Sequence, residues 1–293
     1  MNILILGGNR FFGLHLAKIL IQEGHQITLL NRGKTDDGLG HQVERIQADR
    51  RERKKLEKAV EGQKWDLVYD QICYTATEAR EACEIFASKA NRYIVTSSES
   101  VFDHGADQQE IAFDPLSYTF SKEVSAAENY QEAKRQMEVV FTESLIMRNV
   151  AIVRPSLVVG LDDYTQRLHW HVRRTAQQLP MYFPDINIET DFILASDMGL
   201  ALKAVGFSSF TGPVNCTSPG SVRLSDMIQM CERATGKKAV LAREASDDNH
   251  SPYGGDQTKT MNTHLLASIG FKAKPATQWI EQLINEIAQQ TSG

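Results

Sequence analysis

The sequence predicts an α/β protein with a doubly wound parallel sheet and a smaller C-terminal substrate lobe. Short runs of apolar and β-branched residues alternate with longer amphipathic segments along the first half of the chain. The first of these runs leads directly into a glycine-rich turn, and an amphipathic segment follows that turn. This alternation is typical of consecutive βαβ units, in which helices connect parallel strands.

The first unit begins at the N-terminus. We expect a strand over 3–6, a turn over Gly7–Gly13 and a helix that stops near Gly24, with an apolar stripe made of Phe12, Leu16, Ile19 and Leu20. The N-terminus of such a helix directs free backbone N–H groups and the positive end of its dipole at the turn. The turn is therefore predicted to bind a nucleotide pyrophosphate.

Residues of this turn have separate roles. Gly7 permits the tight turn, and Gly13 allows the helix to pack closely on the strand. Arg10 stands where a G-x-x-G-x-x-G fingerprint has its second glycine. We expect cofactor contacts from Gly7, Asn9, Arg10, Phe11, Phe12 and Gly13.

The later elements follow the same rhythm. Strands are expected over 27–30, 43–46, 66–70, 93–96 and 150–153, and crossover helices over about 55–62, 77–90 and 129–147. Beyond residue 155 we expect helices near 165–179 and 224–235, a strand at 213–216 and a polar loop at 247–256. Residues 1–155 are assigned to a dinucleotide-binding Rossmann domain, to which strands within about 190–217 return. Residues 156–293 form mostly the interleaved substrate lobe.

Composition narrows the class of protein. A chain of 293 residues that is 42% apolar can bury a sizeable core. The formal net charge of −5 argues against nucleic-acid binding, and the basic run 50–55 is interpreted as the exposed start of a helix. We find no apolar stretch long enough for a membrane span and no signal peptide, so a cytoplasmic protein is expected.

The four cysteines are interpreted as free thiols in a reducing cytosol. They form no C-x-x-C pair and have no nearby histidines at metal-ligand spacing, so no metal site is predicted.

A tyrosine and a lysine four residues apart suggest acid/base chemistry. The sequence contains two such pairs, Tyr130 with Lys134 and Tyr118 with Lys122. On a helix this spacing places the phenol and the ammonium on one face, where the cation favours phenolate and lowers the tyrosine pKa. We favour Tyr130, because it opens a segment with a sustained apolar stripe, whereas Tyr118 lies in a loop-like region. Ser98, just beyond a predicted strand, is placed to hydrogen-bond a substrate oxygen.

Taken together, these motifs resemble the extended or atypical short-chain dehydrogenase/reductases of the NAD-dependent epimerase/dehydratase family. The resemblance extends over nearly the whole chain and rests on the glycine turn, Ala48–Arg51, Ser97–Phe102, Tyr130–Lys134, Val153–Ser156, Asp191–Asp197, Asn215–Thr217 and Ala267–Phe271. Arg10 with the following Phe11–Gly13 is similar to the branch that contains the chloroplast stem-loop RNA-binding proteins.

The resemblance implies roles for individual residues. Tyr130 would be the acid/base, Lys134 would bind the nicotinamide ribose, and Ser98 would orient the substrate. Asp49 would contact the adenine edge, with Arg50 beside it in the cofactor site. The segment Gln71–Tyr74 departs from the family, which usually has small residues beneath the cofactor.

The second strand is followed by Asn31 and Arg32 instead of an acidic residue. A guanidinium suits a 2′-phosphate, so NADP is predicted over NAD, with Arg10 assisting and NAD left open.

These observations predict an NAD(P)-dependent oxidoreductase or epimerase/dehydratase that transfers hydride on a carbonyl or nucleotide-sugar substrate. The alternative is a non-catalytic NAD(P)-binding regulator or RNA-associated protein on the same fold. The expected partner is a small-molecule substrate, and a homodimer is left open. Candidates for a diphosphate clamp are Arg154, Arg167, Arg173, Arg174 and Arg223, and candidates for the lining of a substrate cleft are His169, Trp170 and His171.

Overall fold

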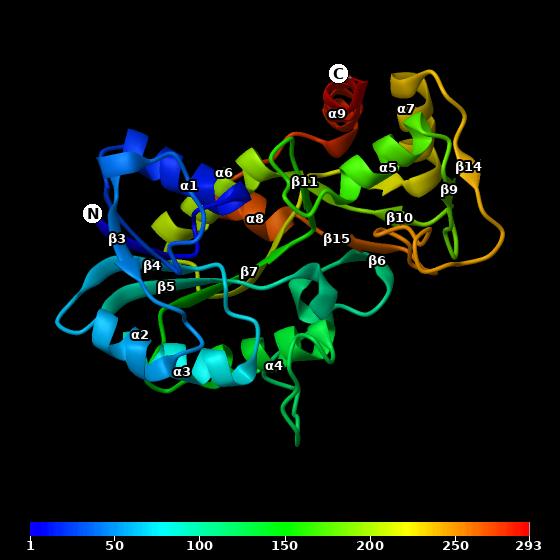
Figure 1. Ribbon diagram of the computed structural model, residues 1–293. Coiled ribbons are helices and arrows are strands. Elements are labelled where there is room, and N and C mark those ends of the chain that lie inside the picture. Colours follow the sequence, from blue (N-terminus) through cyan, green and yellow to red (C-terminus); the bar gives the residue numbers. More distant parts are fainter. Residues whose placement is uncertain (293) are drawn as a thin grey trace.

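The computed structural model describes residues 1–292 and contains a central parallel sheet of seven strands (Figure 1). The strand order is β12-β7-β5-β4-β1-β2-β3, and all neighbours run parallel. These strands are β1 (Asn2–Leu6), β2 (Gln26–Asn31), β3 (Glu44–Gln47), β4 (Trp65–Asp70), β5 (Ala90–Thr96), β7 (Val150–Pro155) and β12 (Gly212–Cys216).

Helices cover both faces of this sheet. One face carries α1 (Phe11–Gln22) and α6 (Ala195–Phe207), and the opposite face carries α2 (Arg53–Ala59), α3 (Ala76–Phe86) and α4 (Tyr130–Glu143) (Figure 1). A separate hydrophobic core lies on each face. The predicted doubly wound α/β fold is therefore confirmed.

Local sequence explains where the helices begin and end. Thr75 caps α3 with a capping box, since its hydroxyl accepts from the Glu78 N–H and the Glu78 carboxylate accepts from the Thr75 N–H. The Asn129 side chain caps α4 in a similar way. Helix α4 is shorter than predicted, because Ser144 is extended at ψ 118°.

The second lobe has its own hydrophobic core, between helices α5 (Arg167–Ala176), α7 (Leu224–Thr235) and α9 (Ile280–Ser292). Its short strands form three small sheets, which contain β6 (Gly105–Gln108), β8 (Leu157–Val159), β9 (Pro180–Met181), β10 (Glu189–Thr190), β11 (Phe192–Leu194), β13 (Val222–Arg223), β14 (Val240–Leu241) and β15 (Lys259–Met261). Helix α8 (His264–Ile269) contacts β12 and α6. Short 3-10 helices lie at Gly40–Gln42, Glu99–Val101, Glu110–Ala112 and Ala276–Gln278.

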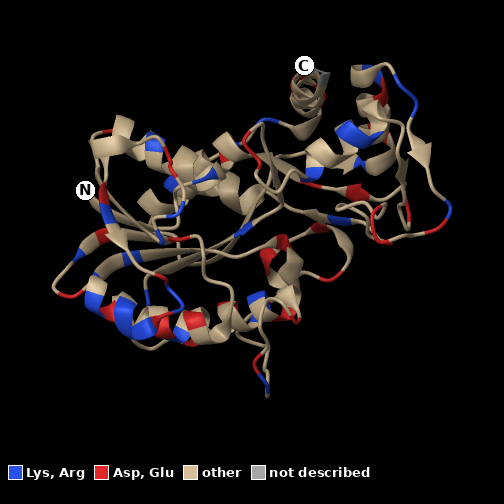
Figure 2. Ribbon diagram, in the orientation of Figure 1, with Lys and Arg blue, Asp and Glu red and all other residues tan. Residues whose placement is uncertain are grey.

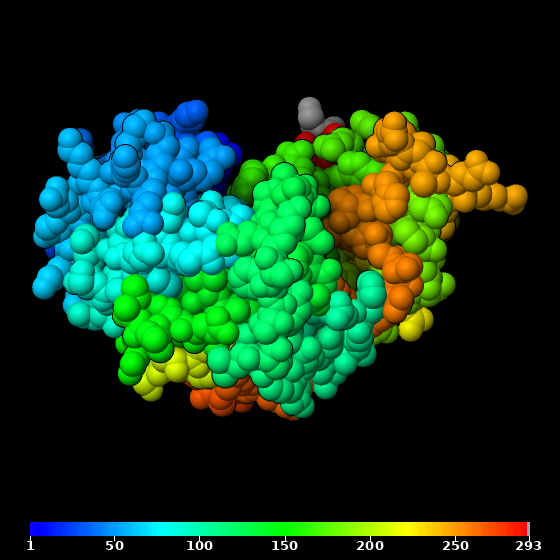
Figure 3. Space-filling model, turned by 90° about the horizontal axis from the view of Figure 1, so that it is seen from below, coloured from blue at the N-terminus to red at the C-terminus, as the bar shows by residue number. Residues whose placement is uncertain are grey.

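The chain crosses between the lobes more than once. After the small strands β10 and β11, it returns to the central sheet, where β12 pairs with β7. Strand β11 does not join that sheet and pairs with β8 instead. In the view from below, the segment between β6 and α4 lies between the cyan surface and the orange surface of the second lobe (Figure 3). Its Glu123 pairs with Arg80 of α3.

Charged residues of both signs are mixed on the surface, and the cysteines are not in disulfides. Acidic and basic residues are interspersed on the helices below the sheet (Figure 2). The basic run at α2 is largely paired with carboxylates, as in Arg51–Asp49, Arg53–Glu84 and Lys55–Glu52. All four cysteines are free, as predicted, and all four are buried. None of the described helices has the length and apolar character that a membrane crossing requires.

Candidate active site

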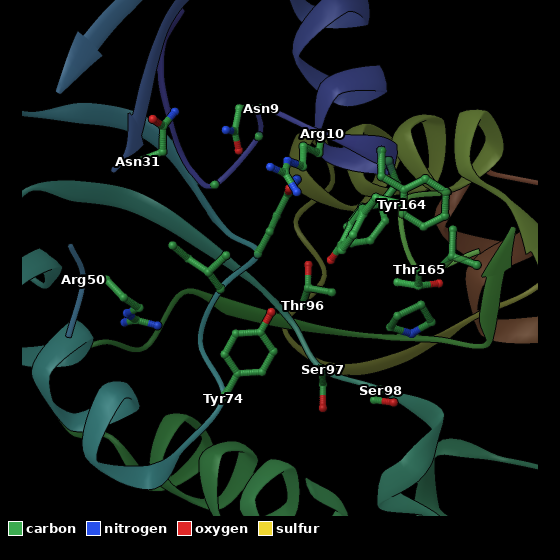
Figure 4. A pocket seen from close by; sticks show the side chains of 18 of the residues that line it. Asn9, Arg10, Asn31, Arg50, Tyr74, Thr96, Ser97, Ser98, Tyr164 and Thr165 are labelled. Carbon is green, nitrogen blue, oxygen red and sulfur yellow. The ribbon is translucent and has the colours of Figure 1, made fainter. Parts of the chain in front are cut away.

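A cavity of about 980 Å³ lies at the carboxyl edge of the central sheet and is lined by residues of both lobes. The cavity includes the switch point of the sheet, which lies between the neighbouring strands β1 and β4. From β1 the strand order continues to β2 and β3 on one side, and from β4 it continues to β5 and β7 on the other. This is where doubly wound folds bind their ligands. Side chains converge on it from the glycine turn, from the ends of β2, β4 and β5, from α4 and from the segment before α5 (Figure 4).

The glycine turn leaves room for a ligand at one side of the cavity. Gly7 and Gly8 adopt φ angles of +93° and +74°, which side-chain-bearing residues rarely adopt. A Cβ on Gly13 would lie 3.0 Å from the Gly8 Cα and 1.9 Å from the Gln71 Oε1. No side chain caps the N-terminus of α1 among the described residues. The turn therefore keeps helical N–H groups uncapped and fits a pyrophosphate.

Cations gather where the adenosine end of a dinucleotide is expected. This part of the cavity is lined by three cationic side chains, those of Arg10, Arg32 and Lys34, and by Asn31. The Asn31 side chain accepts from the Gly33 N–H, and within the described chain the Arg32 guanidinium has no hydrogen-bond or ion-pair partner. The residues present thus fit an anionic cofactor.

Asp49 and Arg50 also border the cavity but have partners of their own. Asp49 accepts from the backbone and the guanidinium of Arg51, which lowers the pKa of its carboxyl. Arg50 is buried, with Nη1 lying 3.0 Å from an Asp70 carboxylate oxygen and Nη2 donating to the Glu78 carbonyl. Arg50 therefore ties the end of β4 to α3 at the cavity wall.

Tyr130 and Lys134 both face the cavity, whereas Tyr118 is not among its lining residues. Lys134 is 1% exposed, and its Nζ donates to the carbonyls of Cys73 at 2.6 Å and Thr96 at 2.9 Å. The same nitrogen lies 5.9 Å from the centroid of the Tyr130 ring. The Tyr118 hydroxyl instead donates to the Glu132 carboxylate, outside the cavity.

Burial controls the protonation of this pair. Desolvation lowers the pKa of Lys134 to about 8. Desolvation also raises the pKa of Tyr130, which the neighbouring Ser98 hydroxyl and Arg167 oppose. The lysine alone would lower the pKa of Tyr130. The pKa is raised instead, because the protein around the cavity removes water from the phenol.

Tyr74 lies beside both of these side chains. Its ring centroid lies 4.6 Å from the Lys134 Nζ and 6.5 Å from the Tyr130 ring, and its ring points into the cavity (Figure 4). Its backbone N–H donates to the Glu78 carboxylate, which fixes it at the start of α3. This bulky residue narrows the cavity where the sequence departed from the family pattern.

Ser98 and Ser97 follow β5 and have different surroundings. Ser98 lines the cavity near Tyr130, and its hydroxyl accepts from the Ser100 N–H. Ser97 donates to the buried carboxylate of Glu138, which is ion-paired with Arg154 at 2.6 Å. Arg154 is fully buried, so the expectation that it belongs to a substrate clamp is wrong. It instead connects α4 to β7.

The other candidates of the second lobe divide into two groups. Arg174 and Arg223 pair with Asp248 and Glu189, respectively, and neither these nor Arg173 lines the cavity. His171 is packed in the core between the rings of Phe183 and Tyr253, and His169 and Trp170 also lie outside the lining. Arg167, at the start of α5, does line the cavity.

Glu99 lies next to Ser98 in the cavity wall, and the sequence analysis gave it no role. Its Oε2 is buried and has no hydrogen-bond partner among the described residues. Desolvation and the neighbouring Asp191 raise the pKa of Glu99 to about 8, against the opposing charges of Lys259 and Arg167. Glu99 therefore keeps its proton at neutral pH. The signal that the sequence offered for Glu99 is its position, as a charged residue directly after Ser98 beyond a predicted strand.

We expect Glu99→Gln to become more stable relative to the wild type as the pH rises. The folded wild type retains the proton up to about pH 8, whereas the unfolded carboxyl loses it near its ordinary pKa of 4.5. Wild-type stability therefore falls as the pH rises through this interval, and a neutral glutamine is unaffected. The Tm of the variant should match the wild type near pH 4.5 and exceed it by about 5–10 °C at pH 8.5.

Differential scanning fluorimetry over this pH range checks the expectation. Glu143→Gln, at the exposed end of α4, is the control and should show a constant difference from the wild type. A constant difference for Glu99→Gln as well would mean that Glu99 is ionised throughout.

The sequence pattern of the NAD dependent epimerase/dehydratase family matches residues 3–206. The protein belongs to this family. The match covers the glycine turn, Tyr130 with Lys134 and the strands that bring them together. The predicted resemblance to the family is thereby confirmed.

A curated relative in this family is the chloroplast stem-loop binding protein of 41 kDa b of Arabidopsis thaliana. It is 28% identical over an alignment of 207 residues, and the match covers 64% of this chain and 50% of that protein. The chain thus spans about half the length of the curated relative.

Solved structures of epimerases and dehydratases share the fold. UDP-glucose 4-epimerase of Thermotoga maritima, solved with UDP-glucose, has a TM-score of 0.78 at 14% identity, with 100% of both chains covered. The Thermus thermophilus UDP-glucose 4-epimerase in complex with NAD has a TM-score of 0.74 at 15% identity and covers 100% of this chain and 99% of its own. The dTDP-glucose 4,6-dehydratase of Bacillus anthracis, also with NAD, has a TM-score of 0.74 at 14% identity, with 99% and 97% covered.

Proposed function

We propose that the protein is an NADP-dependent epimerase, dehydratase or oxidoreductase that acts on a carbonyl compound or on a nucleotide-sugar. The observation that carries this proposal is the placement of Tyr130 and Lys134 in the same cavity as the glycine turn. One end of the cavity suits a pyrophosphate, and the other holds a proton-transfer pair. UDP-glucose and NAD, the ligands named for the solved structures, agree with a nucleotide-sugar substrate and a dinucleotide cofactor, while the preference for NADP rests on Arg32.

In this proposal the dinucleotide supplies the hydride acceptor and donor when it is bound. The Tyr130 hydroxyl gives or takes the proton at the substrate oxygen, and Ser98 orients that oxygen by a hydrogen bond. Lys134 has three N–H donors, two of which bond to the Cys73 and Thr96 carbonyls. The third donor meets only the Met137 sulfur at 4.0 Å, a weak acceptor that a ribose hydroxyl can replace. The positive charge favours the phenolate form of Tyr130 and opposes the desolvation that raises its pKa.

Glu99 gives the substrate side a second proton-carrying group. A carboxyl that keeps its proton at neutral pH can donate a hydrogen bond to a substrate hydroxyl or protonate a hydroxyl that leaves as water. Arg167 is the cation beside it in the cavity wall. A protonated Glu99 beside the Arg167 cation supports elimination of water from the substrate, in addition to oxidation and reduction.

Activity is tested with the purified full chain, NADP or NAD, and a panel of nucleotide-sugars and carbonyl compounds. Absorbance of the reduced cofactor reports net oxidation or reduction, and a separate product analysis is needed for epimerisation and dehydration, which leave no net cofactor signal. Turnover of a member of the panel supports the proposal. Cofactor binding without turnover of any compound would favour the regulator alternative.

The choice of NADP rests on Arg32. We expect Arg32→Ala to weaken NADPH binding by about 10- to 150-fold and to affect NADH binding much less, since a charge-assisted contact with the 2′-phosphate contributes roughly 1.5–3 kcal/mol. Isothermal titration calorimetry with both cofactors measures the two affinities.

Arg148→Ala is the matched control for this measurement. Arg148 is an exposed arginine before β7, at the edge of the sheet opposite the cavity, and its removal should leave both affinities unchanged. Equal losses of NADPH and NADH affinity in Arg32→Ala would reject the role of Arg32 in cofactor choice.

The name of the Arabidopsis relative raises RNA stem-loop binding as a second candidate. The structure offers it limited support, because the basic residues of α2 are mostly paired with carboxylates. A mobility-shift titration with a stem-loop RNA at 0.15 M salt tests it. We expect no retardation at micromolar protein, and specific retardation would favour this function over catalysis.

A further inference from the structure

A segment of the second lobe, residues 160–166, reaches across to the glycine turn of the first. A Cβ on Gly160 would lie 3.6 Å from the Phe11 ring, and the rings of Phe11 and Tyr164 meet edge to face at 6.1 Å. The Asp162 carboxylate lies 3.1 Å from the His15 Nε2 on α1. The segment is therefore attached to both the turn and the helix that follows it.

Arg10 links this segment to the opposite wall of the cavity. Its Nε and Nη2 donate to the Thr35 hydroxyl at 3.1 Å and 2.5 Å, and its guanidinium carbon lies 5.6 Å from the centre of the Tyr164 ring. Arg10 and Tyr164 lie next to each other above the cavity (Figure 4), and all three residues line it. They form a continuous bridge from the loop after β2 to the second lobe.

The second-lobe end of this bridge is firmly positioned. The Asp163 carboxylate accepts from both the N–H and the hydroxyl of Thr165, and Gln166 adopts a left-handed φ of 52° immediately before α5. Tyr164 is nevertheless 60% exposed. Because the Tyr164 ring is so exposed, it contributes little to the hydrophobic core. It lines the cavity and can cover a ligand bound there.

We propose that Arg10 and Tyr164 form a clasp that closes over the phosphates of the bound dinucleotide and slows its release. The ligand in this inference rests on the proposed function. The guanidinium gives the phosphates a charge-assisted donor, and stacking on Tyr164 holds that donor in place. Arg10 thus replaces the close backbone approach of a second glycine with a side-chain contact that connects the two lobes.

The test measures the rate of cofactor release by stopped-flow fluorescence, with bound NADPH chased by excess NADP. The same experiment is run with NADH where that is the cofactor that binds. Tyr164→Ala should speed release by roughly 3- to 30-fold, the range of a cation–π contact. Tyr164→Phe keeps the ring and should release the cofactor at the wild-type rate.

A double-mutant cycle distinguishes a clasp from two independent contacts. Arg10→Ala should speed release at least as much as Tyr164→Ala, and the double variant should add little to Arg10→Ala because the two side chains act together. Leu161→Ala, an exposed position in the same segment, is the control and should not change the rate.

Each outcome has one meaning. An unchanged release rate in Tyr164→Ala, or strictly additive effects in the cycle, would overturn the clasp while leaving the proposed function in place. A wild-type chain that binds neither NADPH nor NADH would overturn both.

Discussion

Tyr130→Phe is expected to lower turnover by at least ~10²-fold while leaving cofactor affinity nearly unchanged. The substitution removes only the transferable proton of a side chain that faces the cavity, and it keeps the ring that packs near Tyr74 and Lys134. Turnover is measured with the best compound from the substrate panel, and cofactor affinity by calorimetry on the same preparation.

Tyr118→Phe is the matched control, because Tyr118 belongs to the second tyrosine–lysine pair of the chain. Its hydroxyl bonds to Glu132 outside the cavity, so its loss should change turnover by less than about 2-fold. Full activity of Tyr130→Phe, or inactivity of Tyr118→Phe, would contradict the assignment of the acid/base.

Gly13→Val is expected to abolish dinucleotide binding. A Cβ at this position would overlap the Gln71 side chain and lie 3.0 Å from the Gly8 Cα, and valine adds two further methyl groups. Because the Gly8 backbone cannot move aside as a side chain can, the helix and the turn are forced apart and the phosphate-binding N–H groups are displaced. Fluorescence titration with NADPH and NADH measures the loss.

Two variants separate this local effect from general destabilisation. Gly24→Ala, at the other end of α1, meets no atom within 4 Å but strains a residue at φ +80°, so it should lower the Tm while preserving binding. Gly13→Ala combined with Gln71→Ala removes the side chain that obstructs the new methyl group and should bind better than Gly13→Ala alone. Normal affinity of a folded Gly13→Val would mean that the cofactor does not lie on this turn.

The conformation of the glycine turn can be predicted from the sequence alone. Backbone conformation is decided locally, because a residue at φ +93° such as Gly7 is strongly favoured to be glycine wherever the turn lies in the fold. The apolar stripes of the helices and the β-rich runs are local signals as well. The doubly wound sheet, its order of elements and the glycine turn therefore followed from the sequence, and pyrophosphate binding by that turn stays a prediction.

The choice between the two tyrosines shows the opposite case. Tyr118 and Tyr130 have the same spacing to a lysine, and the sequence favoured Tyr130 through the helix around it and through its longer spacing from Ser98. The cavity provides the physical distinction. Segments that are distant in the sequence bring Ser98 to Tyr130 and the Cys73 carbonyl to Lys134, whereas Tyr118 is not among the lining residues.

The sequence by itself determined the fold class and the segments that carry the site, because propensity, periodicity and turn chemistry depend on neighbours along the chain. The tertiary structure decided which charged groups are available. Arg154 is ion-paired with Glu138, whereas Arg32 has no hydrogen-bond or ion-pair partner in the described chain. It also decided protonation, raising the pKa of Glu99 and lowering that of Lys134. Desolvation and pairing depend on residues that meet only after folding, so no local pattern encodes them.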